Sequence, residues 1–227
     1  MRLWSDTFRD GSAIPAQCAL AAIDPVSRVR LSGNRHPHLA WDEVPAGTES
    51  LVLFCIDGDA PQDGSDVNLE GRTVPASLAR GDFFHWTLAD LPPTVCVLPE
   101  GALAAGVVAH GKPGPAVTLA ANGAVHALRQ GINDYTGWFA GDPAMAGDYY
   151  GYDGPCPPWN DLRLHHYIFR IYALDVPRLA LEGRFTGPEA CAAIHGHIID
   201  EAQLIGTYTL NPALVSASNS AQRAPKK

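Results

Sequence analysis

The stretch "YDGPCPPWNDLRLHHYIFRIYAL" occupies residues 152–174 and combines a proline-dense turn with an apolar run. The run, Leu164–Leu174, is rich in aromatic and β-branched residues and lacks glycine and proline, which predicts a β-strand. Because side chains alternate along a strand, His165 and Tyr167 share one face while His166 lies on the other. The prolines fix the path of the turn and donate no backbone hydrogen bonds. We therefore expect the turn and the strand to form the wall of a small anion-binding pocket.

Two further apolar runs predict strands of the same β-rich domain. Leu51–Ile56 is apolar at every position, which is typical of a central strand that is covered on both faces. Phe83–Leu91 carries His85 within an otherwise apolar and aromatic run. The 22 glycines and 19 prolines of the chain indicate many connections and few long helices.

One helix is predicted near the C-terminus. Thr186 and Glu189 fit the S/T-x-x-E capping box, and an early proline lies between them. Apolar residues then recur at helical spacing, so we expect a helix over 187–205 that packs on the β core. A short final strand is expected at 206–210.

The length and composition of the chain favour a single domain. A chain of 227 residues that is 46% hydrophobic can bury a substantial core. We expect one domain over 1–211 and a flexible C-terminal tail over 212–227, because the last residues are polar and low in complexity.

Charge and cysteine content exclude several classes of function. The formal net charge of −8 argues against a nucleic-acid partner, because phosphates are neutralised by clustered Lys and Arg. No apolar run approaches the ~20 residues that span a bilayer, and the N-terminus does not resemble a secretory signal. The five cysteines are widely separated and form no C-x-x-C pair, as expected of reduced thiols. These features favour a soluble, cytoplasmic protein.

Neither a cofactor nor a metal is expected from the motifs. The segment at 106–113 matches a phosphate-binding P-loop through Lys112, but Pro113 replaces the Ser or Thr that would hold magnesium. His195 and His197 would point to nearly opposite sides of the predicted helix and could not share one ion. The common hydrolase signatures G-x-S-x-G and H-E-x-x-H are absent from the sequence.

The segment "IDGDAP" follows the first apolar strand and carries two carboxylates. Asp57 and Asp59 project from the same side if the extended conformation persists, and Pro61 fixes the backbone beyond them. An Asp-rich turn that bonds only its own backbone is an equal alternative. His85 needs a hydrogen-bond partner on an inward strand face, and a carboxylate such as Asp57 would serve; otherwise His85 is a satisfied core histidine.

Taken in order, these segments resemble the signatures of the phosphatidylethanolamine-binding protein family, in particular its bacterial Raf-kinase-inhibitor-like branch. The matching stretches include "IDGDAP", "FFHWTLADLP" and "GPCPPWNDLRLHHYIFRIYALD", and the resemblance spans nearly residues 1–210. It implies a mainly β fold, a Greek-key β-sandwich with a few flanking helices. It also implies a small pocket for phosphate-like anions.

Matched motif by motif, the resemblance assigns eight residues to that pocket: Asp57, Asp59, Pro61, His85, Cys156, Pro158, His165 and Tyr167. The chain departs from the family pattern at Gly58, where proline is usual, and at His166, where arginine is usual. A tract between the acidic turn and His85 and extra residues before the proline-rich turn predict a reshaped pocket mouth.

The function expected from the sequence is that of a binding module for a phosphate or phosphoethanolamine-like head group. His85, His165 and Tyr167 would donate to the anion, Asp57 would orient a histidine, and Asp59 would stabilise the turn. The family resemblance adds regulation of a kinase or another protein partner. Two alternatives stay open: an enzyme that uses a His/Asp pair with Cys156, and a scaffold with a vestigial pocket. The oligomeric state is open as well, with a homodimer among the options.

Overall fold

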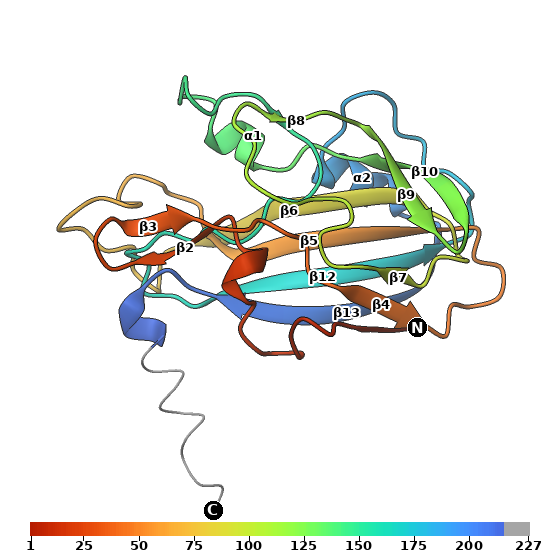
Figure 1. Ribbon diagram of the computed structural model, residues 1–227, viewed down its shortest axis with the longest axis horizontal. Coiled ribbons are helices and arrows are strands. Elements are labelled where there is room, and N and C mark those ends of the chain that lie inside the picture. Colours follow the sequence, from red (N-terminus) through yellow and green to blue (C-terminus); the bar gives the residue numbers. More distant parts are fainter. Residues whose placement is uncertain (216–227) are drawn as a thin grey trace, which may run out of the picture.

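The computed structural model describes residues 1–215, and its main element is an antiparallel six-stranded sheet (Figure 1). The strands follow the order β13-β12-β5-β6-β10-β9 across this sheet. Their bounds are β5 Ser50–Pro61, β6 Arg80–Leu91, β9 Ala116–Ala121, β10 Ala124–Gln130, β12 His165–Leu174 and β13 Ile198–Tyr208. The mainly β class predicted from the sequence is confirmed.

A smaller sheet covers one face of the large one and closes a β-sandwich. Its strands are β1 Arg2–Trp4, β4 Leu39–Asp42 and β7 Val97–Leu98, in the order β1-β4-β7. Leu39 and Trp41 of β4 pack against Leu53, Trp86 and Phe169 of the large sheet in one continuous core. All five side chains are buried, so burial of this apolar area holds the two layers together.

The second face of the large sheet is covered by helix α2, Gly187–Ile194, and by the chain that precedes it. Val52 and Phe54 of β5 face this side, whereas Leu51 and Leu53 face the sandwich core. Both sets are fully buried. The unbroken apolar run in β5 therefore arises because both faces of this strand are covered.

The predicted C-terminal helix begins as expected but is much shorter. The capping box forms between Thr186 and Glu189, yet the helix ends at Ile194 and β13 occupies 198–208. Gly196 follows the helix with φ +89°, a left-handed conformation that commonly ends helices. The prediction of a helix over 187–205 was therefore wrong beyond 194, because the apolar residues that follow also fit a strand. The predicted strand at 206–210 coincides with the end of β13 over 206–208, and residues 209–210 lie beyond it.

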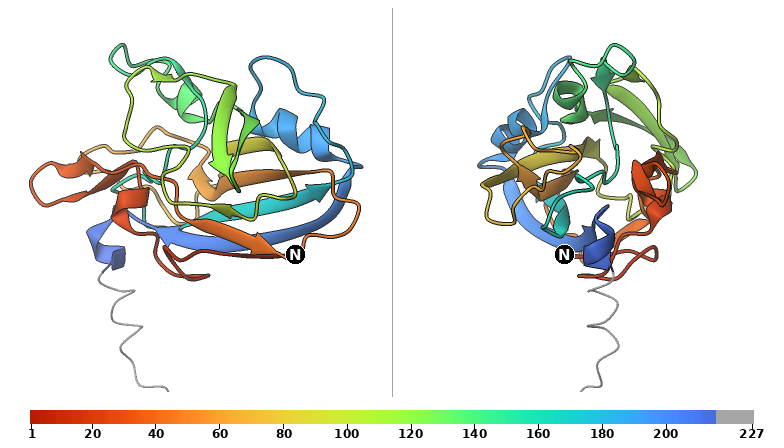
Figure 2. Two further views of the ribbon diagram at one scale, coloured as in Figure 1. Left: turned by 45° about the vertical axis from the view of Figure 1, so that its right-hand side comes forward. Right: turned by 90° about the vertical axis from the view of Figure 1, so that its left-hand side faces the viewer.

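Short elements gather at one end of the sheet, beside the ends of β5, β6 and β12 (Figures 1 and 2). They are the hairpin β2 Ala21–Asp24 and β3 Arg28–Leu31, the 3-10 helix η1 Ala16–Cys18, helix α1 Tyr135–Trp138, and the parallel pair β8 Gly111–Lys112 and β11 Asp148–Tyr149. This end of the molecule holds the candidate site.

In residues 1–215 we find no helix whose length and hydropathy would let it cross a bilayer. Of the predicted flexible tail, residues 212–215 form a helical turn, and 216–227 lie outside the described residues.

Candidate functional site

The register of three neighbouring strands brings the predicted site residues together. Asp57 of β5 lies opposite Tyr167 of β12 on one side and opposite Phe83 of β6 on the other. Residues that pair across strands share a face, so these side chains project into the same space. The β5–β6 register shifts beside His85, which adds one residue to β6 at this point.

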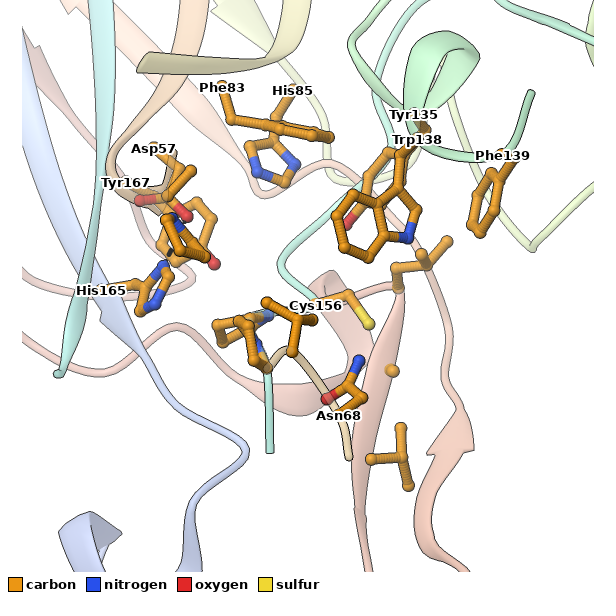
Figure 3. Close-up of a pocket in the computed structure, with 18 of the residues that line it drawn as sticks. Asp57, Asn68, Phe83, His85, Tyr135, Trp138, Phe139, Cys156, His165 and Tyr167 are labelled. Atoms are coloured by element: carbon orange, nitrogen blue, oxygen red, sulfur yellow. Dashed lines mark hydrogen bonds and ion pairs between the residues drawn. The ribbon is translucent and has the colours of Figure 1, made fainter. Parts of the chain in front are cut away.

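A cavity of about 370 Å³ lies over these strand ends (Figure 3). Seven of the eight predicted residues line it: Asp57, Pro61, His85, Cys156, Pro158, His165 and Tyr167. In Figure 3, Asp57, His165 and Tyr167 form one wall, and Trp138 and Phe139 lie on the other side. We call the part of the cavity lined by Asp57, His85, His165 and Tyr167 the pocket floor.

Asp59 is the predicted residue that does not line the cavity. A register irregularity between Asp57 and Ala60 breaks the alternation that would place both carboxylates on one side. Asp59 instead accepts hydrogen bonds from the side chains of Arg163 and His166, at 2.5 and 2.7 Å. Burial opposes ionisation of Asp59, but these bonds outweigh it and lower its pKa. Asp59 thus ties the turn to the start of β12, as its predicted stabilising role requires.

His165 is held between two carboxylates. Its Nδ1 lies 2.7 Å from Oδ2 of Asp57, and its Nε2 lies 3.1 Å from Oδ2 of Asp161. Asp161 also accepts two hydrogen bonds from the guanidinium of Arg80, at 2.6 and 2.9 Å. The side chains of all four residues are at least nine-tenths buried. Both ring nitrogens of His165 are therefore occupied, and this imidazole has no N–H left for a ligand.

The charges of this network favour a protonated His165. Burial alone would lower its pKa, but the hydrogen bonds and negative charges of Asp161 and Asp57 outweigh burial and raise the pKa to about 9. Burial would likewise raise the pKa of Asp161, but its bonds from His165 and Arg80 lower it to about 2. His165 is thus a fixed cation near neutral pH. The expectation that it donates to an anion was wrong, because the sequence did not reveal Asp161 as its second partner.

This raised pKa predicts a pH-dependent stability. The folded state keeps the proton on His165 up to about pH 9, whereas the unfolded chain releases it near 6.5. The stabilisation is therefore fully present below ~6.5 and is lost as the pH rises through 9. We expect the excess in unfolding free energy of the wild type over His165→Gln to shrink by about 3 kcal/mol between pH 6 and pH 10. Urea unfolding of both proteins measures this excess, and a constant value would contradict the assignment.

His85 faces the cavity as a neutral hydrogen-bond acceptor. Its Nδ1 lies 2.7 Å from the backbone carbonyl oxygen of Asp153, so Nδ1 carries the proton and Nε2 is left with a lone pair. Burial lowers the pKa of His85, and the nearby charges of Asp57 and Asp153 only partly oppose this effect. The partner suggested from the sequence, Asp57, belongs to His165 instead. The expectation that His85 donates to an anion was also wrong, because its proton is held on Nδ1 by the carbonyl of Asp153.

Tyr167 supplies a hydroxyl that has no hydrogen-bond partner among the described residues. The side chain is fully buried and lines the cavity. Burial and the charge of Asp57 raise the pKa of the phenol well above its ordinary value, so the hydroxyl keeps its proton. Because a buried polar group without a partner is costly, this hydroxyl marks a position where a bound acceptor is favoured.

The buried side chain of Asp153 holds the start of the proline-rich turn in place. Its carboxylate accepts hydrogen bonds from Asn34 and Asn133, at 2.7 and 2.8 Å, and pairs with the ammonium of Lys112 at 2.8 Å. Burial lowers the pKa of Lys112, and the charge of Asp153 partly opposes this. The P-loop-like lysine is thus committed to this ion pair. Asp153 also fixes His85 through its carbonyl, so it positions both the turn and a floor residue.

The rest of the cavity is an apolar rim that the sequence did not predict. It is lined by Leu20, Ala21, Val29, Leu31, Val67, Phe83, Trp138, Phe139 and Met145. These residues come from the β2–β3 hairpin, the loop after β5, the start of β6, and the region around α1. Their side chains belong to segments distant in the chain, so no local motif announces them. Both segments that predicted a reshaped mouth do line the cavity: the tract before His85 contributes Val67 and Asn68, and the residues before the proline-rich turn contribute Trp138, Phe139 and Met145.

Within residues 1–215, no group of three or more His, Cys, Asp or Glu side chains is arranged to hold a metal ion. His195 and His197 lie after the end of α2, and His197 pairs with Asp175 at 2.9 Å.

Comparison with known proteins identifies relatives over most of the chain. Residues 4–209 match the family profile described as phosphatidylethanolamine-binding protein. A UPF0098 protein of Methanothermobacter thermautotrophicus is 32% identical over 209 residues, which cover 92% of this chain and 98% of that protein. The UPF0098 protein YbhB of Escherichia coli is 28% identical over 209 residues, which cover 92% of this chain and 100% of that protein.

Solved structures show the same arrangement of the chain. The Chlamydia trachomatis protein CT736, described as a homologue of phosphatidylethanolamine-binding protein, is 27% identical with a TM-score of 0.57, and the match covers 91% of this chain and 95% of that one. The Escherichia coli protein YbcL is 23% identical with a TM-score of 0.61, with 92% and 97% covered. At that identity, YbcL supports the shared fold alone.

Proposed function

The chain belongs to the phosphatidylethanolamine-binding protein family, and from this premise we propose that it binds a small molecule with an oxyanion head group and performs no chemistry on it. The head group would lie on the pocket floor. A phosphate or phosphoethanolamine group fits this description, as the sequence motifs suggested.

The observation that carries the proposal is the unpartnered hydroxyl of Tyr167 beside a buried cation. The hydroxyl can donate to an anionic oxygen, and the protonated His165, two residues away on the same strand face, offsets the negative charge of Asp57 that would otherwise repel the anion. Low dielectric strengthens both effects in a buried site. His165 would act through its charge and through Asp57, which it holds in place.

The apolar rim favours a ligand that is larger than its head group. A cavity of about 370 Å³ falls within the range of small-molecule sites, which are mostly apolar with a few placed polar groups. Trp138 and Leu31 are exposed large side chains at this rim. Burying them under an apolar part of the ligand would be favourable. We therefore place an apolar group of the ligand against the rim.

The enzyme alternative requires a reactive nucleophile, and Cys156 is the candidate. Burial raises the pKa of its thiol to about 12, so the thiolate is scarce at neutral pH. We expect iodoacetamide at pH 8 to modify Cys156 about two to three orders of magnitude more slowly than the exposed Cys96. Mass spectrometry of the labelled chain measures both rates. Preferential labelling of Cys156 would instead favour catalysis.

The proposed function is tested by NMR titration with phosphoethanolamine at pH 7. We expect shifts around the pocket floor and roughly 10- to 100-fold weaker binding by Tyr167→Phe, which removes one hydrogen bond to a charged group. Tyr172→Phe is the matched control, because Tyr172 lies on the same strand outside the cavity lining. Shifts scattered over the surface, or equal affinity of the wild type and Tyr167→Phe, would overturn the proposal.

Regulation of a kinase or another protein partner stays a prediction of the family resemblance. A pull-down with purified candidate kinases would test it separately from the pocket.

A further inference from the structure

The pocket floor offers a ligand more hydrogen-bond acceptors than donors. Resting on the proposed function, we propose that the pocket selects an oxyanion that carries its own proton, such as a phosphomonoester monoanion. It would discriminate against oxyanions without one, such as sulfate or a phosphodiester.

The acceptors are His85 and Asp57. The carbonyl of Asp153 fixes the His85 proton on Nδ1, so Nε2 faces the cavity with a lone pair. The carboxylate of Asp57 lines the cavity and already accepts bonds from His165 and from the backbone of Asp59, at 2.7 and 2.8 Å. An oxygen of the ligand that approaches either group needs a proton to donate, since two acceptors repel.

Donors are scarce at the same place. Tyr167 offers its hydroxyl, whereas both nitrogens of His165 are occupied by carboxylates. The hydroxyl of Tyr135 donates to the carbonyl of Gly154 at 2.8 Å. The proline-rich turn adds at most the Cys156 amide.

The proline-rich turn offers few backbone N–H donors because of its sequence and its own hydrogen bonds. Residues 155, 157 and 158 are prolines, and the amide of Gly154 donates to the side chain of Asn34 at 2.8 Å. At the pocket floor, a fully ionised oxyanion would therefore meet few donors, and it would have no proton to share with Nε2 of His85 or with Asp57. An oxyanion with one O–H can donate to one of these two acceptors while another of its oxygens accepts from Tyr167.

The groups around His85 keep the donors and acceptors of the pocket floor unchanged near neutral pH. The titratable groups that face it are Asp57 from β5, His165 and Tyr167 from β12, Tyr135 from α1, and Asp153 and Cys156 from the turn. His165 stays protonated to about pH 9, and burial keeps the two phenols and the thiol neutral by raising their pKa values. Between pH 5.5 and 7.5, the pH dependence of binding should therefore follow the proton of the ligand.

Calorimetric titration of the full chain with three probes tests this inference. Phosphoethanolamine is a monoester, glycerophosphoethanolamine is the diester head group of a lipid, and sulfate carries no proton. At pH 5.5 we expect the monoester to bind on the order of 100-fold more tightly than the other two. Its affinity should fall roughly 25-fold by pH 7.5, because its proton dissociates near pH 6.

Two variants separate selectivity from affinity. His85→Gln places an amide that can donate where the acceptor was, so the monoester-to-sulfate ratio should collapse toward one. Tyr167→Phe should weaken all three probes and preserve the ratio. If His85→Gln does not fold, the monoester-to-sulfate affinity ratio of the wild type, together with the pH dependence of monoester binding, tests the selectivity by itself.

The outcomes are distinct for the two proposals. Sulfate or the diester binding within about threefold of the monoester in the wild type would overturn the selectivity and leave the proposed function standing. Absence of binding by all three probes would overturn both.

Discussion

Replacing His165 with leucine is expected to lower the free energy of unfolding at pH 7 by about 3–5 kcal/mol. The substitution leaves the buried carboxylate of Asp57 without a cation, while Asp161 keeps its bonds to Arg80. An ionised carboxylate without compensation is strongly disfavoured in a buried site. Urea unfolding followed by circular dichroism measures the loss.

The neighbouring histidine provides the matched control. His166 is half-exposed and pairs with Asp59 on the other face of β12. His166→Leu is expected to change stability by less than about 1 kcal/mol, since His166 is half-exposed and Asp59 keeps its bond from Arg163. Equal effects of the two substitutions would show that His165 is not held in a buried charge network.

The second large effect is expected at Asp153. Asp153→Asn removes the charge partner of Lys112 and puts amide hydrogens where Asn34 and Asn133 donate. We expect a loss of about 3–5 kcal/mol in unfolding free energy, because a buried ammonium is left unpaired. The carbonyl that fixes His85 shifts with the turn, so binding of phosphoethanolamine should weaken as well.

A double substitution tests the cause of this loss. Combining Lys112→Met with Asp153→Asn removes the buried ammonium that the single variant leaves unpaired, and should restore part of the lost unfolding free energy. Asp148→Asn, in the exposed ion pair with Arg184, serves as the surface control with an expected change below about 1 kcal/mol. If the double variant is as unstable as the sum of its single variants, the ion pair does not explain the loss.

The sequence predicted the walls of the site well and its hydrogen bonds poorly. Alternation along a strand correctly placed His165 and Tyr167 on one face, because side-chain period is a local property. The partners of these residues depend on register and bulges. Asp161 reaches His165 from within the turn, and the irregularity after Asp57 turns Asp59 away. Local spacing does not encode such contacts.

The limits of the secondary-structure prediction have the same origin. The capping box at Thr186 is a local signal and correctly marked where α2 begins. Its end depended on Gly196, and the apolar residues beyond fit β13 as well as a helix. In β13, Leu204 and Gly206 are buried, and a side chain at Gly206 would clash with Ile14. Such packing is set by the tertiary structure.

The central claim is that the pocket floor receives an oxyanion at the hydroxyl of Tyr167 and the Nε2 of His85. A crystal structure of the chain grown with phosphoethanolamine at pH 5.5 tests it most directly. We predict phosphate oxygens within hydrogen-bond distance, about 3 Å, of both atoms. A phosphate bound elsewhere on the protein, or a pocket floor without it at saturating concentration, would contradict the account.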